Sequence, residues 1–323
     1  MELDLFHGQE IYVFFFKYGI KGIWGLLICN AIIGYSIYKT LKIVNENEIN
    51  DYEDFINIIT NYKFSKINKY INVIINTFLL FSFFIMVSGF GSFFEQEFKI
   101  NRIIGSTILA IIAFILFVGN IKMIVKINDK IVPILIGVIV LVGLFNLSKI
   151  NINEIHYIDT DKSNFYWIID AIVYASYNIL LIIPCLINLK VYLKNKKQIK
   201  WTSIITTIVL LIISLLVYFL LLKNTSYNSI EMPLLYVIKN NYNFFSIIFG
   251  IILLIAIFTT AISIGMGLIK NISNKNNIVK ISFTICFFSI MVANFKFSTL
   301  VKFIYPFMGY VGLFELYYLI KYG

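Results

Sequence analysis

The sequence predicts an all-α membrane protein with several membrane-spanning helices. Apolar residues make up 59% of the 323 residues and charged residues only 14%, a composition outside the range of soluble domains. Long apolar windows follow one another along the whole chain, without the period-two alternation of a transmembrane barrel strand. No long polar block separates them, so we expect a single transmembrane domain over residues 1–323.

Nine windows are long enough to cross a bilayer, which takes about 20 mostly apolar residues. A further apolar segment, residues 9–18, precedes them and is too short to cross alone. We therefore expect nine full spans with a half-span at the N-terminus. The nine windows are residues 20–42, 71–94, 103–121, 131–148, 165–189, 202–222, 243–269, 278–295 and 299–320.

The distribution of basic residues predicts the orientation. Alternate loops on one side of the membrane hold most of the lysines, and the tract KVYLKNKKQIK at 190–200 is the densest of them. Because loops rich in Lys and Arg stay in the cytoplasm, we expect this side and the C-terminus to be cytoplasmic.

Two loops are expected to contain short helices. DYEDFINIITNYKFSK has apolar residues at helical spacing and acids in its first turn, which predicts an amphipathic helix on the cytoplasmic surface. SIEMPLLYVIKN has Pro233 ahead of an apolar pattern, which predicts a helix on the outer side. Each helix either gates access to the interior or only covers helix ends.

Carboxyl groups inside spans are candidates for function, because an ionisable group there costs about 2.5–3.5 kcal/mol on insertion scales. The three candidates are Glu10, Asp170 and Glu315, of which Glu315 is near enough to a span end to reach water. In WIIDAIVYASYNILLIIPC, polar residues cluster at one end and Pro184 removes a backbone donor. This span either unwinds around a polar cavity or is a Pro-kinked helix with interfacial tyrosines. The predicted solute-facing residues are Glu10, Asp170, Tyr174, Ser176, Tyr177 and Asn178.

Three hydroxyl residues in IAIFTTAISIGMGL form a second candidate group: Thr259, Thr260 and Ser263. Thr259 and Ser263 are four residues apart and share one helix face. Hydroxyls on one face either help to coordinate sodium or bond to a neighbouring helix.

Other classes of function have little support in the sequence. The three cysteines and two histidines stand alone, without metal-ligand spacing, so we expect no metal site and no cofactor. The lysines are scattered among short loops, so the net charge of +10 does not predict a nucleic-acid partner. No Walker loop, dinucleotide fingerprint or nucleophile elbow occurs, and we expect neither an enzyme nor an ATP-driven pump.

Six stretches in order resemble the YkvI-like bacterial membrane proteins, over nearly the whole chain from Gly8. These proteins are placed with the amino acid, polyamine and organocation transporters, so the resemblance implies a location in the bacterial cytoplasmic membrane. The six stretches are GQEIYVFFFKYG, a DYEDFI-type loop, VYASYNILL, EMPLLYVIK, IFTTAIS and IYPFMGYVGLFEL.

The resemblance implies a LeuT-like fold, in which five spans are repeated in inverted orientation and the first helix of each repeat is broken. The repeats would cover about residues 1–148 and 165–323. The hydroxyls of Thr259, Thr260 and Ser263 would then lie in the eighth span, where related transporters bind sodium. Family members usually carry a glycine-rich half-helix of the type GTxxGAGxxSGQE, whereas this chain has MELDLFHGQE. We expect either a truncated or misassigned reading frame or a diverged paralogue.

The function that follows is a secondary transporter of a small, amino acid-like solute, coupled to sodium or protons. Glu10 and Asp170 would line the pathway as proton acceptors or amine partners, facing one another across a central cavity. One alternative is a ligand-sensing membrane subunit of the germination-receptor type, which binds but does not transport. The other is an inactive truncated paralogue.

Overall fold

The structure is a computed structural model that describes residues 8–49, 51–62, 68–119, 133–134, 136–144, 165–193, 195–222, 230–241, 243–272 and 276–322. Within these ranges the chain forms helices and short connections, and no strand. The helices are α1 (Gln9–Phe14), η2 (Phe16–Tyr18), α2 (Ile20–Glu46), α3 (Tyr52–Ile59), α4 (Asn68–Phe98), α5 (Arg102–Val118), α7 (Tyr166–Asn188), η4 (Leu189–Val191), α8 (Lys196–Leu221), α9 (Pro233–Asn241), α10 (Asn243–Ile272), α11 (Ile278–Val292) and α12 (Phe297–Lys321).

Six of these helices are long and apolar enough to cross a membrane: α2, α4, α7, α8, α10 and α12. Two others, α5 with 17 residues and α11 with 15, are apolar but shorter. The predicted span 131–148 lies partly outside the described residues, and its described part, 136–144, is helical. The prediction of an all-α, multi-span membrane protein is thus confirmed.

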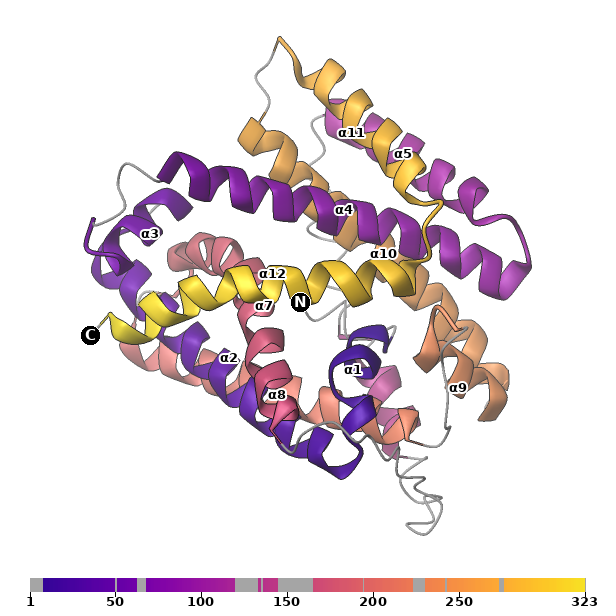
Figure 1. The fold of residues 1–323 in the computed structure, drawn as a ribbon, viewed down its shortest axis with the longest axis horizontal. Coiled ribbons are helices and arrows are strands. Elements are labelled where there is room, and N and C mark those ends of the chain that lie inside the picture. Colours follow the sequence, from indigo (N-terminus) through magenta and orange to yellow (C-terminus); the bar gives the residue numbers. More distant parts are fainter. Residues whose placement is uncertain are drawn as a thin grey trace.

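The helices pack in two groups (Figure 1). In the first group α7 packs against both α2 and α12, and α8 packs on the other side of α2. In the second group α4 packs against α5 and α10, and α11 lies against α5. Contacts of α12 with α4 join the two groups, and the short helix α1 contacts α7, α8 and α12.

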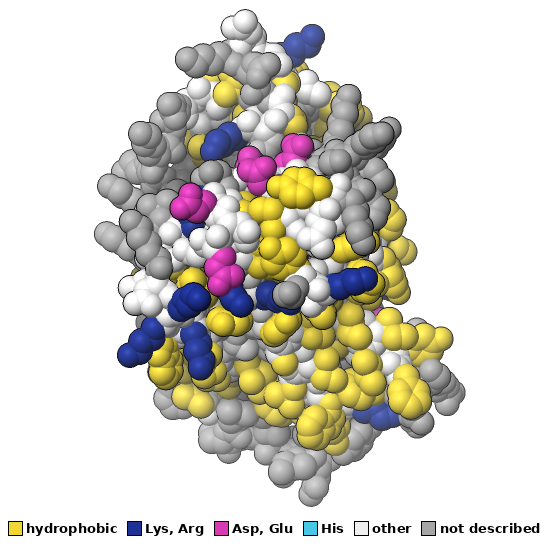
Figure 2. All heavy atoms as spheres, turned by 90° about the vertical axis from the view of Figure 1, so that its left-hand side faces the viewer, with side chains coloured by type: hydrophobic (Ala, Val, Ile, Leu, Met, Phe, Trp, Pro, Cys, Tyr) yellow, Lys and Arg dark blue, Asp and Glu magenta, His cyan; other side chains and the backbone are white. Residues whose placement is uncertain are grey.

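Apolar side chains cover much of the outside of the spans, as lipid contact requires. On α12, for example, Phe303 and Phe307 are 68% and 63% exposed. Figure 2 shows the end of the molecule at which α3 and the C-terminus lie, where a row of basic side chains borders a broad hydrophobic surface. A basic row beside an apolar surface is typical of the boundary between lipid tails and headgroups.

The expected half-span at residues 9–18 is an interrupted helix. α1 ends at Phe14, Phe15 leaves the helical conformation, and a single 3₁₀ turn, η2, leads to Gly19. Gly19 has φ 51°, in a region that favours glycine. The carbonyl of Gly19 accepts hydrogen bonds from the backbone N–H of Gly22, at 2.9 Å, and from the hydroxyl of Tyr218, which joins the start of α2 to α8.

The break expected in the predicted span 165–189, the first of the second repeat, is absent. α7 is one helix from Tyr166 to Asn188, and Pro184 lies inside it without ending it. The polar residues before Pro184 therefore belong to a regular helix, and the second interpretation of this segment, a Pro-containing helix, is the one the structure favours.

Both predicted loop helices are present. α3 begins at an N-cap, Asp51, whose side chain accepts a hydrogen bond from the backbone N–H of Asp54 at 2.8 Å. α9 begins at Pro233 and contacts α1, α8 and α10. Its approach is fixed by Gln96 of α4, whose side chain accepts a hydrogen bond from the backbone N–H of Met232 at 2.9 Å.

Candidate functional site

Glu10 lies fully buried where α1 meets α7. The phenol of Tyr177, itself buried on α7, donates a hydrogen bond to Oε2 of the Glu10 carboxyl. α1 is held at this place by Gly8, whose φ of 79° starts the helix and whose missing Cβ leaves room for Leu234 of α9. The sequence predicted both Glu10 and Tyr177 as site residues, and the structure brings them into contact.

Aromatic rings surround this pair. The ring of Phe14 lies 5.8 Å from that of Tyr177, and the ring of Tyr174 meets it edge-on at 5.3 Å. The ring of Tyr305, from α12, stacks on that of Tyr177, with ring centroids 4.9 Å apart and an interplanar angle of 26°. The phenol that bonds to Glu10 therefore belongs to a cluster of rings from α1, α7 and α12, and aromatic π-faces suit an apolar or cationic group.

Tyr305 was not among the predicted residues. It lies in IYPFMGYVGLFEL, which the sequence placed only as a span. What brings it to the site is a pair of glycines on α12: a Cβ on Gly309 would lie 2.5 Å from the carbonyl oxygen of Val173, and one on Gly312 would lie 2.5 Å from that of Ser176. The Gly-x-x-Gly spacing was the available clue, since small residues let two spans approach closely.

Asp170, one of the predicted site residues, contacts two residues of η2. Its Oδ2 accepts a hydrogen bond from the phenol of Tyr18 at 2.8 Å and lies 2.7 Å from the Nζ of Lys17. The side chains of Lys17 and Asp170 are 37% and 22% exposed, so this ion pair is partly open to the surroundings. Seven residues, or about 10 Å of helix, separate Asp170 from Tyr177. That the two carboxyls face one another across a central cavity remains a prediction.

Ser176 and Asn178 are buried and bonded within α7. The hydroxyl of Ser176 donates to the carbonyl of Ile172 at 2.7 Å, and the amide of Asn178 donates to that of Tyr174 at 2.8 Å. These i−4 bonds satisfy donors that lack water in a membrane interior. Their assignment as solute-facing residues remains a prediction.

Of the three hydroxyl residues on α10, Thr259 and Thr260 are buried and Ser263 is exposed. Thr259 donates to the carbonyl of Ala256 at 3.1 Å, and Ser263 donates to that of Thr259 at 2.8 Å. The hydroxyl of Thr260 has no hydrogen-bond partner among the described residues. α10 packs chiefly against α4, α9 and α5, and the cation site predicted from these three residues remains a prediction.

Glu315 forms a second buried carboxyl contact that the sequence did not reveal. It is only 2% exposed, so the expectation that it reaches water is wrong. The phenol of Tyr52, on α3, donates a hydrogen bond to its Oε1 at 2.6 Å. Burial beside this carboxyl raises the pKa of Tyr52 well above its ordinary value, so the phenol stays protonated and keeps its hydrogen-bond donor. The contact ties the surface helix α3 to α12.

A cavity of about 380 Å³ opens beside this contact. Its wall comes from α3, α4, α7 and α10, and includes Tyr52, Leu79, Pro184 and Asn271. The cavity is thus at the same end of the molecule as α3, on the side that the basic residues assign to the cytoplasm.

Two proteins of Bacillus subtilis are similar to this chain over almost their whole length. The uncharacterized protein YyaD is 24% identical over 318 residues, which cover 98% of this chain and 91% of YyaD. The uncharacterized membrane protein YkvI is 24% identical over 320 residues, which cover 95% of this chain and 88% of YkvI. No family model matches the chain. The two relatives support a YkvI-like relationship and, with the six apolar helices, a membrane protein.

Proposed function

We propose that this protein is a secondary transporter of a small organic, amino acid-like solute, which binds beside Glu10 and Tyr177. The observation that carries the proposal is the buried contact between these two side chains. An ionisable side chain inside a span costs stability and is retained where it serves a pathway for ions or solutes. A carboxyl between two helices from different halves of the chain has the chemistry to take up a proton or to hold an ammonium group.

The order of helix contacts supports a LeuT-like inverted repeat for this transporter. α1, α2, α4 and α5 from the first half of the chain contact α7, α8, α10 and α11 from the second half, in the same order. These four pairs occur beside other contacts, such as that of α2 with α7, and are pairs that two repeats of five spans related by a pseudo-two-fold axis would bring together. The short helices follow the same pattern, because α3 contacts α7 and α9 contacts α1.

The two short helices give alternating access a structural basis. α9 lies over α1 at one end, and Glu231, just before it, accepts hydrogen bonds from the backbone N–H and the hydroxyl of Ser298 at 2.9 and 3.1 Å. At the other end the contact of Tyr52 with Glu315 holds α3 against α12. In this proposal each end opens when its short helix moves, with sodium or protons driving the cycle.

Replacing Tyr52 by Phe is expected to open the α3 end. The change removes the phenol from Glu315, a buried carboxyl whose other oxygen, Oε2, has no hydrogen-bond partner among the described residues. The reporter is Leu79→Cys, in the wall of the neighbouring cavity, and the exposed Cys185 is replaced by Ser so that it is not labelled. Opening is measured as faster labelling of the introduced cysteine by a membrane-impermeant maleimide in inside-out vesicles. Loss of a hydrogen bond to a carboxyl corresponds to about a ten-fold or greater increase in labelling rate.

Tyr38→Phe is the matched control, since Tyr38 lines a different cavity. An unchanged labelling rate in Tyr52→Phe would show that the contact does not hold this end closed.

Ligand binding tests the proposed solute class. The purified chain is heated with a panel of amino acids, amines and carboxylates, and its Tm is measured with and without sodium. A solute at 100 times its Kd stabilises a protein by about 2.7 kcal/mol, enough for a clear rise in Tm. The expected result is a rise with a zwitterionic or cationic solute that disappears in Glu10→Gln. A panel without any such rise would remove the support for a solute site here.

A further inference from the structure

A groove on the membrane face of α2 and α8 has no part in the proposed transport cycle. It has a volume of about 470 Å³ and runs between the two helices. Its lining residues are Ala31, Gly34, Tyr35, Tyr38, Lys200, Ser203, Ile204, Thr207 and Ile208. On each helix these residues recur every three or four positions, so they form one continuous stripe per helix.

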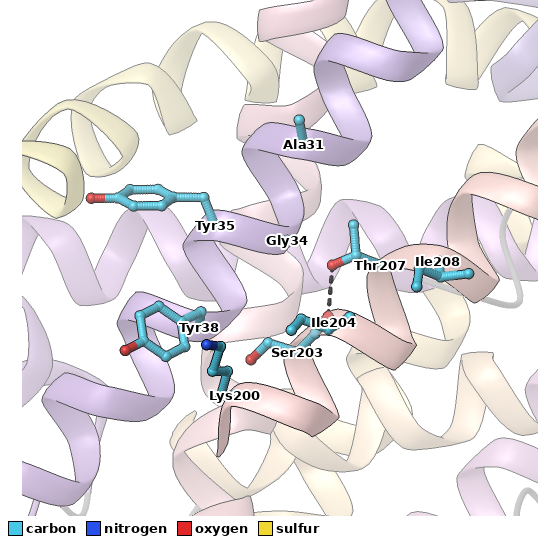
Figure 3. A pocket seen from close by; sticks show the side chains of 9 residues that line it. All are labelled: Ala31, Gly34, Tyr35, Tyr38, Lys200, Ser203, Ile204, Thr207 and Ile208. Atoms are coloured by element: carbon cyan, nitrogen blue, oxygen red, sulfur yellow. Dashed lines mark hydrogen bonds between the residues drawn. The ribbon is translucent and has the colours of Figure 1, made fainter. Parts of the chain in front are cut away.

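The two ends of the groove differ in chemistry. Figure 3 shows Tyr38, Lys200 and Ser203 at one end, and Ala31 and Ile208 at the other. The antiparallel courses of α2 and α8 account for this arrangement. From Lys200 to Ile208 the groove follows α8 for about 12 Å, close to the depth of one bilayer leaflet.

The polar end is strongly basic. The last two turns of α2 and the first two turns of α8 contain five lysines and a single glutamate: Lys39, Lys42, Glu46, Lys196, Lys197 and Lys200. The glutamate, Glu46, lies 3.8 Å from Lys196, and Lys39 lies over the ring of Tyr35 at 5.5 Å. Trp201, next to Lys200, is 55% exposed, as expected for an aromatic side chain at the level of the headgroups.

We propose that this groove binds an anionic phospholipid, with its phosphate at Lys200 and the adjacent hydroxyls and one acyl chain along Ile204 and Ile208. The charge of the lysines complements the phosphate, and the N-terminus of α8 adds favourable dipole charge at the same level. The apolar end matches an acyl chain, because Ile204 and Ile208 are one helical turn apart on the wall of the groove. The site lies in the leaflet that the basic residues assign to the cytoplasm.

Native mass spectrometry of the full chain in detergent tests the site with phosphatidylglycerol and phosphatidylcholine as probes. The wild-type chain is expected to retain one phosphatidylglycerol in preference to phosphatidylcholine. Lys200→Gln is expected to lower the retention of phosphatidylglycerol about five-fold, the contribution of one lysine near an anionic lipid. Ala31→Phe, which fills the apolar end, is expected to lower the retention of both lipids.

The matched control is Lys197→Gln, because Lys197 is exposed on the same turn of α8 but does not line the groove. Equal losses in Lys197→Gln and Lys200→Gln would mean general attraction to a basic surface and would overturn the proposal. Equal retention of the two lipids by the wild type would also overturn it. A wild-type dimer that Ala31→Phe dissociates would overturn it too, since the occupant of the groove would then be a second copy of the chain. Variants are compared only if they are monodisperse and keep the wild-type Tm.

Discussion

Glu10→Gln is expected to abolish most ion-driven solute uptake into proteoliposomes while leaving the protein folded. The substituted amide has the size of the carboxyl but neither releases a proton nor carries the charge that would hold an ammonium group. Hydrogen bonds to a charged group contribute about 1.5–3 kcal/mol, so the change corresponds to a loss of about 10- to 100-fold in solute affinity. Uptake rates and solute affinity, measured with the same reconstituted protein, separate an effect on binding from one on coupling.

Two further variants test whether the hydrogen bond between Tyr177 and Glu10 matters more for uptake than the carboxyl of Asp170. Tyr177→Phe keeps the ring that stacks on Tyr305 and removes the phenol that bonds to Glu10, so it should reproduce much of the loss. Asp170→Asn removes the charge from a partly exposed carboxyl that contacts Lys17 and Tyr18, and it should have a far smaller effect. If Asp170→Asn abolished uptake and Glu10→Gln did not, the solute site would have to be placed at the Asp170 end of α7.

Gly312→Ala is expected to be strongly damaging. The added Cβ would lie 2.5 Å from the backbone carbonyl oxygen of Ser176, and a helix backbone cannot move away as a side chain can. Overpacking of a well-packed interior costs about 1–3 kcal/mol. The expected result is a lower Tm in detergent and loss of the stacking of Tyr305 on Tyr177, and hence weaker solute binding.

Gly267→Ala is the matched control. Gly267 also lies within a spanning helix, α10, but a Cβ at this position would meet nothing within 4 Å. This substitution should leave the Tm unchanged or raise it, because alanine favours the helix by about 1 kcal/mol over glycine. Equal effects of the two substitutions would show that α12 does not depend on close contact with α7.

The sequence was sufficient to predict the helices, because lipid imposes length and apolar composition on each span. α2, α8, α10 and α12 each contain most of their predicted window, and α3 and α9 lie where acids in a first turn and a proline indicated helix starts. The half-span at residues 9–18 was also predicted, since its apolar run is too short for a span, but its interruption at Phe15 was not.

Contacts between helices could not be predicted in the same way. Glu315 lies near the end of its span, and only the position of α3 decides that it is buried against Tyr52 instead of reaching water. Asp170 likewise has the same sequence context whether it faces Glu10 or the Lys17 side chain. Pro184 removes one backbone donor, but packing on both sides of α7 keeps the helix continuous.

Solute accumulation against a gradient is the most direct test of the proposed transport function. The wild-type chain is reconstituted in liposomes with an imposed sodium or proton gradient, and uptake of the solute that raises its Tm is followed over time. The account predicts accumulation above the external concentration that collapses when the gradient is dissipated and is absent in Glu10→Gln. Tight binding of the same solute without any uptake under either gradient would contradict a transporter and favour a sensing subunit.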